Sequence, residues 1–528
     1  MNTSTNAKAR YENLKSDRQP FVDRGVRAAH LTMPTLFIDK ENNEVTSEKD
    51  FPTPRQSMGA RGVRNLSSKL LVSLVPTNAP FMRMRPEEAL KQKLNTDPDL
   101  KAEVEKALVG IEAAVMRDVD DKGDRVAMGE AFKHLLVTGN VLLFDDKKDG
   151  LRWFGLNKYV ARRDAGGRLL EIVIAEGFDP ESLPEDVQAL IAQSKNEDEP
   201  RSTKATTVTV YTWIKRDGDA FVAHQEVEDQ VIPDTTSRWP EDRLPYFPLR
   251  MVRIEGEDYG RGYVEEFFGD LESLEVLTGA IVDGAAAASK VLFLVKPNST
   301  TKARVLAKAP NGAIREGNSD DVSVLQMNKV NDFRVASEIA QRIQDRLAHA
   351  FLLNTSVQRN AERVTAEEIR FVAEELEQGL GGIFSILTQE FQLPFAKGRL
   401  ARLQASNKLP QLPKGVVRPV IITGLEALGR GMDRQRLLQY LTTVAQTFGP
   451  EAIAQEMNRS VLMERLAIAD GIELEGLFKT PDQKAAEAQQ SQQQQMISDL
   501  GPDALKQFGP QIAQQVGAAT GVPPQQEE

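Results

Sequence analysis

Two arginines, Arg359 and Arg363, lie in a polar loop just before a predicted helix, where cations can contact a polyanion. The loop reads NTSVQRNAERV over residues 354–364, and its single acid is Glu362. A loop that carries cations between helices suits a moving gate better than a catalytic cleft, and Gln358 is a further polar candidate. Taken alone, this segment is more typical of a surface loop before a core helix.

Further cations gather in a β-rich insert at 291–333 and on the helix that follows it. The insert carries Lys296, Lys302, Arg304 and Lys308. The helix carries Arg334, Arg342 and Arg346, with Glu338 and Asp345 between them. Mixed charges on one helix are ordinary for a solvated face, so ion pairing within the helix is the expected arrangement.

The chain lacks the patterns of common catalytic sites. It has no G-x-x-x-x-G-K-[ST] phosphate loop and no G-x-S-x-G elbow. His224 and Glu226 form H-x-E, but a zinc deaminase also needs P-C-x-x-C, and the chain has no cysteine. The acidic run at 118–124 departs from a calcium loop at its fifth and twelfth positions, Lys122 and Gly129, so we expect a solvated turn there.

Composition narrows the class of protein. The 528 residues carry a formal net charge of −11, which suits a general nucleic-acid binder poorly because phosphate affinity comes from cations. Locally placed cations could still handle DNA. The lack of cysteine excludes disulfides and thiolate metal sites, and the four histidines are scattered, so we expect no metal and no cofactor.

No segment resembles a signal peptide or a membrane span. The N-terminus has no apolar core, and no apolar run approaches the roughly 18–20 residues that a spanning helix needs. We therefore expect a protein that is made and folded in a cytoplasm and has no membrane partner.

The chain is expected to be mainly helical, with a β-rich region between helical ones. Helices are predicted at 5–30, 59–75, 86–119, 124–139, 179–193, 263–290, 334–353 and 365–395. Strands are predicted at 140–144, 151–156, 159–164 and 169–175, in a hairpin at 206–232, and at 246–256. Within the insert, VLFLV, ARVLA and VSVLQM are candidate strands.

The long helix at 365–395 is the most clearly marked element. Thr365 and Glu368 form a capping box at its start. Its apolar stripe is Ile369, Val372, Leu376, Leu380, Ile383, Leu387 and Phe391. Glycines at 379–382 predict a bend. The C-terminal quarter is expected to be helical to about residue 476, broken at prolines that include Pro419, and a Gln-rich stretch follows at 484–496.

Longer runs of the sequence resemble the portal proteins, or head-to-tail connectors, of T7-like short-tailed bacteriophages. The runs are GARGVRNLSSKLLVSLVP (59–76), TGNVLLF (138–144), MVRIEGEDYGRGYVEEFFGDLESLE (251–275), LLNTSVQRNAERVTAEEIRFVAEELEQGLGGIFSILTQEFQLP (352–394) and ITGLEALGRGMD (422–433). Their order and spacing fit nearly the whole chain. Agreement is weaker at 180–205, at 296–321 and beyond about residue 480.

This resemblance implies an α+β, mainly helical portal fold that assembles as a ring of twelve subunits around a central channel. It assigns the chain as follows: 1–262 wing, with a β-rich part at 140–256; 263–290 first stem helix; 291–333 clip; 334–353 second stem helix; 354–364 channel loop; 365–395 long wing-to-crown helix; 396–480 crown; 481–528 a Gln-rich C-terminal barrel or disordered tail. The Gly- and Ala-rich half of the first stem helix would allow close packing.

The resemblance also implies a function without catalysis. Such rings sit at one capsid vertex of the virion, conduct double-stranded DNA during genome packaging and ejection, and nucleate capsid assembly in the host cytoplasm. The implied partners are the terminase large subunit, which supplies ATP hydrolysis, a tail adaptor protein, the major capsid and scaffolding proteins, and internal core proteins. Gln358, Arg359, Arg363, Arg342 and Arg346 become candidates for the DNA channel or gate, and Lys296, Lys302, Arg304 and Lys308 for docking at the clip.

Two other classes of protein stay open at this stage. One is a different phage assembly protein, such as a tail adaptor or a scaffold. The other is an enzyme with an unrecognised site. Electron microscopy distinguishes a ring from the first alternative, and turnover by a pure preparation would favour the second.

Overall fold

The computed structural model describes most of the chain up to residue 449. It covers residues 6–37, 53–77, 80–96, 98–194, 207–288, 292–299, 301–325, 330–353, 376, 383–410, 417–421 and 429–449, and a few positions from 451 to 466. The chain divides into two compact units, Met1–Leu428 and Gly429–Glu528. The boundary falls inside the predicted crown at 396–480. None of the described helices is long and apolar enough to cross a membrane.

Helices at the N-terminal side follow the apolar spacing of the sequence. Helix α1 (Ala7–Leu31) begins at Asn6, whose side chain accepts a hydrogen bond from the Ala9 amide. Helix α2 (Met58–Leu74) buries the predicted stripe Val63, Leu66, Leu70 and Leu74 completely. Helix α5 (Asp124–Thr138) ends at Gly139, whose φ of 75° suits a residue without a Cβ.

The helix predicted over 86–119 is two helices. Helix α3 (Glu88–Thr96) ends before Pro98, and α4 (Pro98–Asp121) begins at that proline. Proline has no amide hydrogen and clashes inside a helix, but it is well tolerated at a first helical position. A break at Pro98 therefore follows from the covalent chemistry of that residue.

Two antiparallel sheets occupy the middle of the first unit. Strands β2 (Asn140–Asp146), β3 (Gly150–Gly155) and β10 (Tyr246–Arg250) pair in the order β10-β2-β3. The larger sheet runs from β4 (Tyr159–Arg163) through β5 (Leu169–Phe178), β6 (Val208–Asp217) and β7 (Ala220–Val227) to the short strands β8 (Gln230–Val231) and β9 (Ser237–Pro240). Helix α6 (Glu185–Ser194) lies between β5 and β6 in sequence, and the pairing of β6 with β7 confirms the predicted hairpin.

A third pairing was not predicted. Strand β1 (Met82–Pro86) pairs antiparallel with β13 (Val417–Ile421), so Met84 faces Pro419. The expectation of helical sequence on both sides of Pro419 is wrong, because residues 417–421 form a strand. Proline is tolerated in a strand with a free edge, and this sheet has two strands among the described residues. Helix α13 (Gly429–Phe448), in the second unit, agrees with the predicted helical C-terminal quarter.

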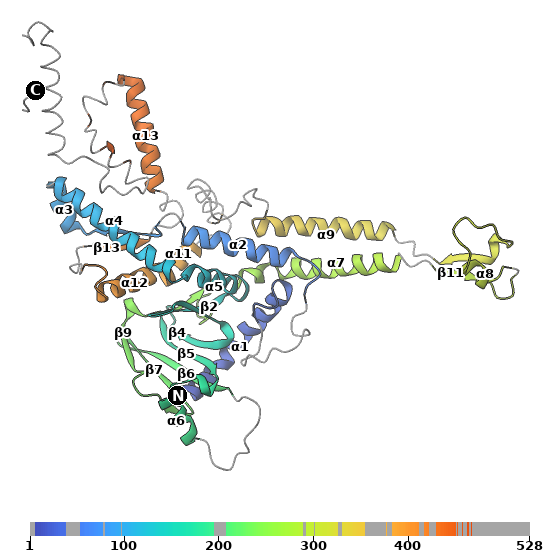
Figure 1. Ribbon diagram of the computed structural model, residues 1–528, viewed down its shortest axis with the longest axis horizontal. Helices are drawn as coiled ribbons and strands as arrows, with labels where there is room; N and C mark the ends of the chain where they lie inside the picture. The colour runs from blue at the N-terminus through green and yellow to red at the C-terminus, as the bar shows by residue number, and fades with distance from the viewer. Residues whose placement is uncertain are drawn as a thin grey trace, which may run out of the picture. The chain divides into compact units, whose positions relative to one another are not determined.

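The two helices that flank the insert lie side by side (Figure 1). Helix α7 (Phe268–Ala288) follows a 3-10 turn at Tyr263–Phe267, and α9 (Val330–Ala350) follows the insert. A Cβ on Gly284 of α7 would lie 2.2 Å from the Phe333 ring of α9. The small residues of α7 therefore allow close packing within one chain.

The insert holds a smaller number of strands than predicted. Strands β11 (Leu292–Val295) and β12 (Val322–Leu325) confirm two of the candidates. The third, ARVLA, is helix α8 (Ala303–Ala307), so its assignment as a strand is wrong. Alanine, arginine and leucine favour helix, and a five-residue apolar run has no diagnostic period.

The described end of the long helix keeps the predicted buried stripe. Leu376, Ile383, Leu387 and Phe391 are all buried. From Ile383 the helix consists of α11 (Ile383–Leu387), a π-helical turn at Thr388–Gln392 and α12 (Leu393–Ala405). It therefore extends ten residues beyond the predicted end at 395. The capping box at Thr365 and the glycines at 379–382 lie outside the described residues.

One large hydrophobic core joins these elements, and it encloses an ionisable side chain. Residues of α1, α2, α4, α5, both larger sheets, α7, α9 and α12 belong to one cluster. His134 of α5 is buried against Trp153, with ring centroids 4.5 Å apart. Burial lowers the pKa of His134 from 6.5 to about 3.

We predict that His134 makes the fold less stable in acid. The unfolded chain binds a proton at His134 as the pH falls below about 6.5, whereas the folded chain stays neutral there until about 3. Acid therefore favours unfolding in this window, by up to about 1.4 kcal/mol per pH unit. His134→Phe should show a smaller drop in melting temperature between pH 7 and 4.5. Exposed His30→Gln serves as the control and should behave like the parent.

Candidate functional site

The structure describes the chain up to the predicted channel loop and again well beyond it. Gln358, Arg359 and Arg363 lie in 354–364, outside the described residues. The chain enters this stretch after Leu353, and its regular helix is described again from Ile383. The contacts that hold these two ends therefore define the frame for the candidate residues.

The entry to the loop is held by α2. The chain leaves α9 through a turn in which Leu352 has a φ of 52°, which is uncommon for leucine. The side-chain amide of Asn65 donates to the carbonyls of Phe351 and Leu352, each at 2.9 Å. The Lys69 ammonium also donates to the Leu352 carbonyl at 2.9 Å. Phe351 is fully buried and lies over Gly62, where a Cβ would collide with the ring.

The helix that follows the loop is held at its π-helical turn, Thr388–Gln392. The Glu390 carboxylate lies 2.6 Å from the guanidinium of Arg250 on β10. The Gln392 side chain donates to the Leu74 carbonyl at the end of α2, at 2.8 Å. Helix α2 therefore contacts the chain just before the predicted loop and again at the π-helical turn of the following helix, through side-chain hydrogen bonds.

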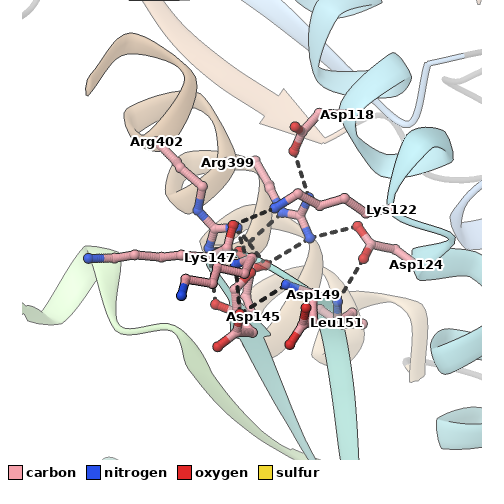
Figure 2. Close-up of polar contacts among 11 residues, drawn as sticks. Asp118, Lys122, Asp124, Asp145, Lys147, Asp149, Leu151, Arg399 and Arg402 are labelled. Carbon is pink, nitrogen blue, oxygen red and sulfur yellow. Dashed lines mark hydrogen bonds and ion pairs between the residues drawn. The ribbon is translucent and has the colours of Figure 1, made fainter. Parts of the chain in front are cut away.

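Past the π turn, α12 is fixed by a buried arginine, and Figure 2 shows its partners. The Arg399 guanidinium is fully buried. It lies 2.6 Å from the Asp118 carboxylate at the end of α4, 2.6 Å from Asp124 at the start of α5 and 2.7 Å from Asp145 on β2. One side chain of α12 thus joins three consecutive elements, α4, α5 and β2, that lie more than 250 positions earlier in the sequence.

Other groups complete this cluster. Arg402 of α12 pairs with Asp145 at 2.7 Å. Asp124 also accepts a hydrogen bond from the Leu151 amide at 2.7 Å, and the Lys122 ammonium donates to the Lys147 carbonyl at 2.9 Å. The three carboxylates are thus paired with two arginines, Arg399 and Arg402 (Figure 2).

The predicted solvated turn at 118–124 is confirmed in its middle, where Lys122 and Gly123 form a turn and Asp120 and Asp121 are exposed. The prediction is wrong for the two ends of the run, because Asp124 is fully buried and Asp118 half-buried, each paired with Arg399. The run alone could not reveal this, since the cation lies some 280 positions further along the chain. Among the described residues, no group of three or more histidines, aspartates and glutamates is placed to hold a metal ion.

Burial and charge act against each other in this cluster. Burial would lower the pKa of Arg399, but Asp145, Asp124 and Asp118 together raise it above its ordinary value. Burial raises the pKa of Asp124, although Arg399 and the Leu151 amide oppose that shift. Burial and the neighbouring arginines lower the pKa of Lys122. The ionised pairs are stable because each charge compensates another that is also shielded from water.

The two channel candidates on α9, Arg346 and Arg342, differ in whether they form an ion pair. Arg346 on α9 pairs with Asp270 on α7 at 2.6 Å, so the expected ion pairing within the helix is wrong for this residue. Asp345 accepts a hydrogen bond from Gln341 at 2.9 Å. Arg342 is exposed, and within the described ranges it has no ion pair. Of the two, Arg342 is therefore the cation available to a ligand.

The four cations of the insert are placed on one small module. Lys296 directly follows β11, Lys302 precedes α8, Arg304 lies on α8 and Lys308 ends it. All four side chains are exposed. In the described part of the chain none of them forms an ion pair, so they are available for contact with another molecule.

The H-x-E pair has a structural role. His224 lies 2.7 Å from the Glu226 carboxylate, whose second oxygen accepts a hydrogen bond from the Ala7 amide at 2.6 Å. The carboxylate therefore holds the first turn of α1 against β7, which accounts for its burial. A negative charge at a helix N-terminus is also favourable to the helix dipole.

Comparison with known proteins covers almost the whole chain. A family model described as bacteriophage head to tail connecting protein matches residues 4–477. The portal protein of Escherichia phage T7 is 41% identical over 508 residues, covering 95% of this chain and 93% of that protein. The portal protein of Enterobacteria phage T3 is 39% identical over 526 residues, covering 98% and 97%.

A solved structure is similar at a lower level. A chain in the virion of a native gene transfer agent particle aligns with 79% of this chain and 90% of its own length, at 9% identity and a TM-score of 0.34. Structural similarity at that level does not support an inference about the function of this chain.

The Arg399 cluster leads to a stability prediction. Arg399→Met would leave the Asp118, Asp124 and Asp145 carboxylates without their shared cation, which should cost about 3–5 kcal/mol of unfolding free energy. Urea unfolding measures the loss. A matched control is Arg238→Met. Arg238 and its partner Asp217 are both more than half exposed, so the variant should lose about 1 kcal/mol or less of unfolding free energy. Equal losses in the two variants would contradict a structural role for the cluster.

Proposed function

The chain belongs to the family of bacteriophage head to tail connecting proteins, and from that premise we propose that it works as a viral portal protein. In this role, a ring of twelve identical subunits at one capsid vertex conducts double-stranded DNA during genome packaging and ejection. The observation that carries the proposal is similarity over almost the full length of the chain, not over a single domain.

The arrangement of elements supports the same role. Helices α7 and α9 form a pair with a small module on the connection between them, as expected for two stem helices and a clip. We propose the wing at 1–262, the stem at 263–290 and 334–353, the clip at 291–333 and the channel loop at 354–364. The long helix, the crown and the C-terminal barrel or tail follow in that order.

Charge gives a physical account of how DNA would pass. With a net charge of −11 per subunit, a ring repels phosphates, so DNA would not stick to its wall. A few cations repeated around the ring can still make transient contacts with the backbone. Arg359, Arg363 and Arg342 are the proposed contacts. Arg346 contributes less because Asp270 neutralises it.

The proposed partners follow the stages of particle assembly. Scaffolding and major capsid proteins, with internal core proteins, assemble around the ring in the host cytoplasm. The terminase large subunit then docks at the clip and supplies ATP hydrolysis, and a tail adaptor replaces it after packaging. The exposed cations Lys296, Lys302, Arg304 and Lys308 are proposed to contribute to docking. The portal itself is proposed to catalyse nothing.

Electron microscopy of the purified protein tests this function directly. A portal should form closed rings with a central channel, and native mass spectrometry should give one dominant ring mass. A tail adaptor or a scaffold is the alternative assembly protein. A stable monomer or simple dimer at micromolar concentration would exclude the portal role.

The proposed gate makes a separate prediction. Arg359→Ala combined with Arg363→Ala should leave the rings intact but lower the DNA content of assembled particles, because the loop loses its contacts with phosphate. DNA per particle is measured by quantitative PCR after nuclease treatment. Arg238→Ala with Arg243→Ala removes the same charge from exposed wing positions and serves as the control. Parental DNA content in the loop variant would remove the gating role.

A further inference from the structure

One Asn-Gly pair occurs in the 528 residues, Asn311-Gly312, and it lies at an exposed turn of the insert between α7 and α9. The Ala313 amide donates to the Pro310 carbonyl at 3.1 Å, which closes a turn with Asn311 and Gly312 at its centre. Gly312 has a φ of 80°, whereas the φ of Asn311 is not positive, as in a type II turn. Glycine adopts this left-handed conformation without strain because it has no Cβ.

The two central residues of this turn have no contacts that would keep them apart. Apart from chain neighbours, no atom lies within 4 Å of the position that a Cβ on Gly312 would occupy. Among the described residues, the Gly312 amide donates no hydrogen bond, and the Asn311 carboxamide neither donates nor accepts one. All residues from Pro310 to Asp320 are exposed. The amide nitrogen of Gly312 can therefore approach the Asn311 side chain once the single hydrogen bond of the turn opens.

This arrangement permits a reaction of the asparagine side chain that needs no enzyme. The deprotonated amide nitrogen of Gly312 attacks Cγ of Asn311, a C–N bond forms, and the carboxamide nitrogen leaves as ammonia. Water then opens the resulting five-membered succinimide, giving aspartate by attack at the side-chain carbonyl or isoaspartate by attack at the main-chain carbonyl. One water is consumed and one ammonia is released, without oxidation or reduction. Glycine hinders the attack least because it has no side chain.

The two other asparagines between β11 and β12 are exposed as well, but hydrogen bonds oppose the same reaction there. The Ser299 amide, which would have to attack Asn298, donates to the Lys296 carbonyl at 3.3 Å. The Asn318 carboxamide oxygen accepts a hydrogen bond from the Asp320 amide at 3.1 Å. A serine follows each of these asparagines, and its Cβ hinders the approach. The local structure therefore favours the reaction at the Asn-Gly turn over these two positions.

We propose that Asn311 is a site of spontaneous deamidation through attack by the Gly312 amide, so that the insert gains an acid as the protein ages. The stretch 292–325 carries five cations and three acids, so its formal net charge of +2 falls to +1 after the reaction. Isoaspartate also adds one carbon to the main chain at the turn. The reaction itself does not depend on the proposed function. It changes charge and shape on the surface that carries the proposed docking cations.

Peptide mapping of the aged full-length protein tests the site. The parent chain, kept for days in mildly alkaline buffer made with heavy-oxygen water, should convert Asn311 to aspartate and isoaspartate that carry one heavy oxygen atom. Alkali speeds the reaction because the attacking nitrogen must lose its proton. Conversion should be about tenfold faster at Asn311 than at Asn298 or Asn318, since each of those positions must first lose a hydrogen bond.

Asn311→Gln is the matched variant, because it keeps a neutral amide but would have to close a six-membered ring, which forms far more slowly. Isoelectric focusing of aged protein should show acidic forms in the parent and fewer of them in Asn311→Gln. A free peptide of residues 308–315 serves as the positive control for the chemistry. Conversion of that peptide while Asn311 stays an amide in the folded protein would overturn the inference, since the turn would then block the attack.

A docking measurement separates this inference from the proposed function. Asn311→Asp carries the added acid from the start, so it should bind the terminase large subunit, the proposed docking partner, more weakly than Asn311→Gln does. Equal binding by the two variants, with conversion of Asn311 observed in the parent, would contradict the proposed docking role of the insert's cations and leave the modification site intact. Absence of conversion in the folded parent would overturn the modification site and leave the proposed function intact.

Discussion

The buried charge of Arg399 is the constraint on which the first unit depends most. Its guanidinium is shared by Asp118, Asp124 and Asp145, so α12, the α4–α5 turn and β2 must all be in place together. Burying charge is costly, and an ion pair of this kind adds less to stability than a well-packed apolar group. Its main effect is to make other positions of α12 costly, because any shift leaves at least one carboxylate buried without a cation.

That anchored frame gives the proposed DNA-handling residues a defined setting. Helix α2 contacts the chain on both sides of the candidate loop, through Asn65 and Lys69 at one end and the Leu74 carbonyl at the other. Helices α7 and α9 are joined to each other near this frame, where the Tyr263 hydroxyl in the turn before α7 donates to the Ala350 carbonyl at 2.9 Å. The frame is thus built from many buried contacts.

Local sequence predicts the parts of this fold that local chemistry determines. The stripe of α2, the Gly139 helix end and the β2–β3 hairpin follow from spacing and turn residues. The β1–β13 pairing and the Arg399 cluster do not, because each joins residues more than 250 positions apart. Helix α8 could not be distinguished from a strand, because five residues are too few to show a helical or strand period. For the candidate site, residue type alone identifies the cations. It does not identify the partner of Arg346, because Asp270 lies on another helix.

The π-helical turn at Thr388–Gln392 has a consequence for how this chain can vary. A π turn holds one residue more than the α-helical turn it replaces, and each residue advances an α-helix by about 100°. Loss of one residue there would give a regular α-helical turn and leave α11 in phase with α12, so Ile383 and Leu387 would stay in the core. Loss of one residue within α11 or α12 would instead rotate part of the helix by about 100° against the core. Single-residue deletions in homologous chains should therefore be tolerated better at this turn than in the helices beside it, because the turn already holds the extra residue.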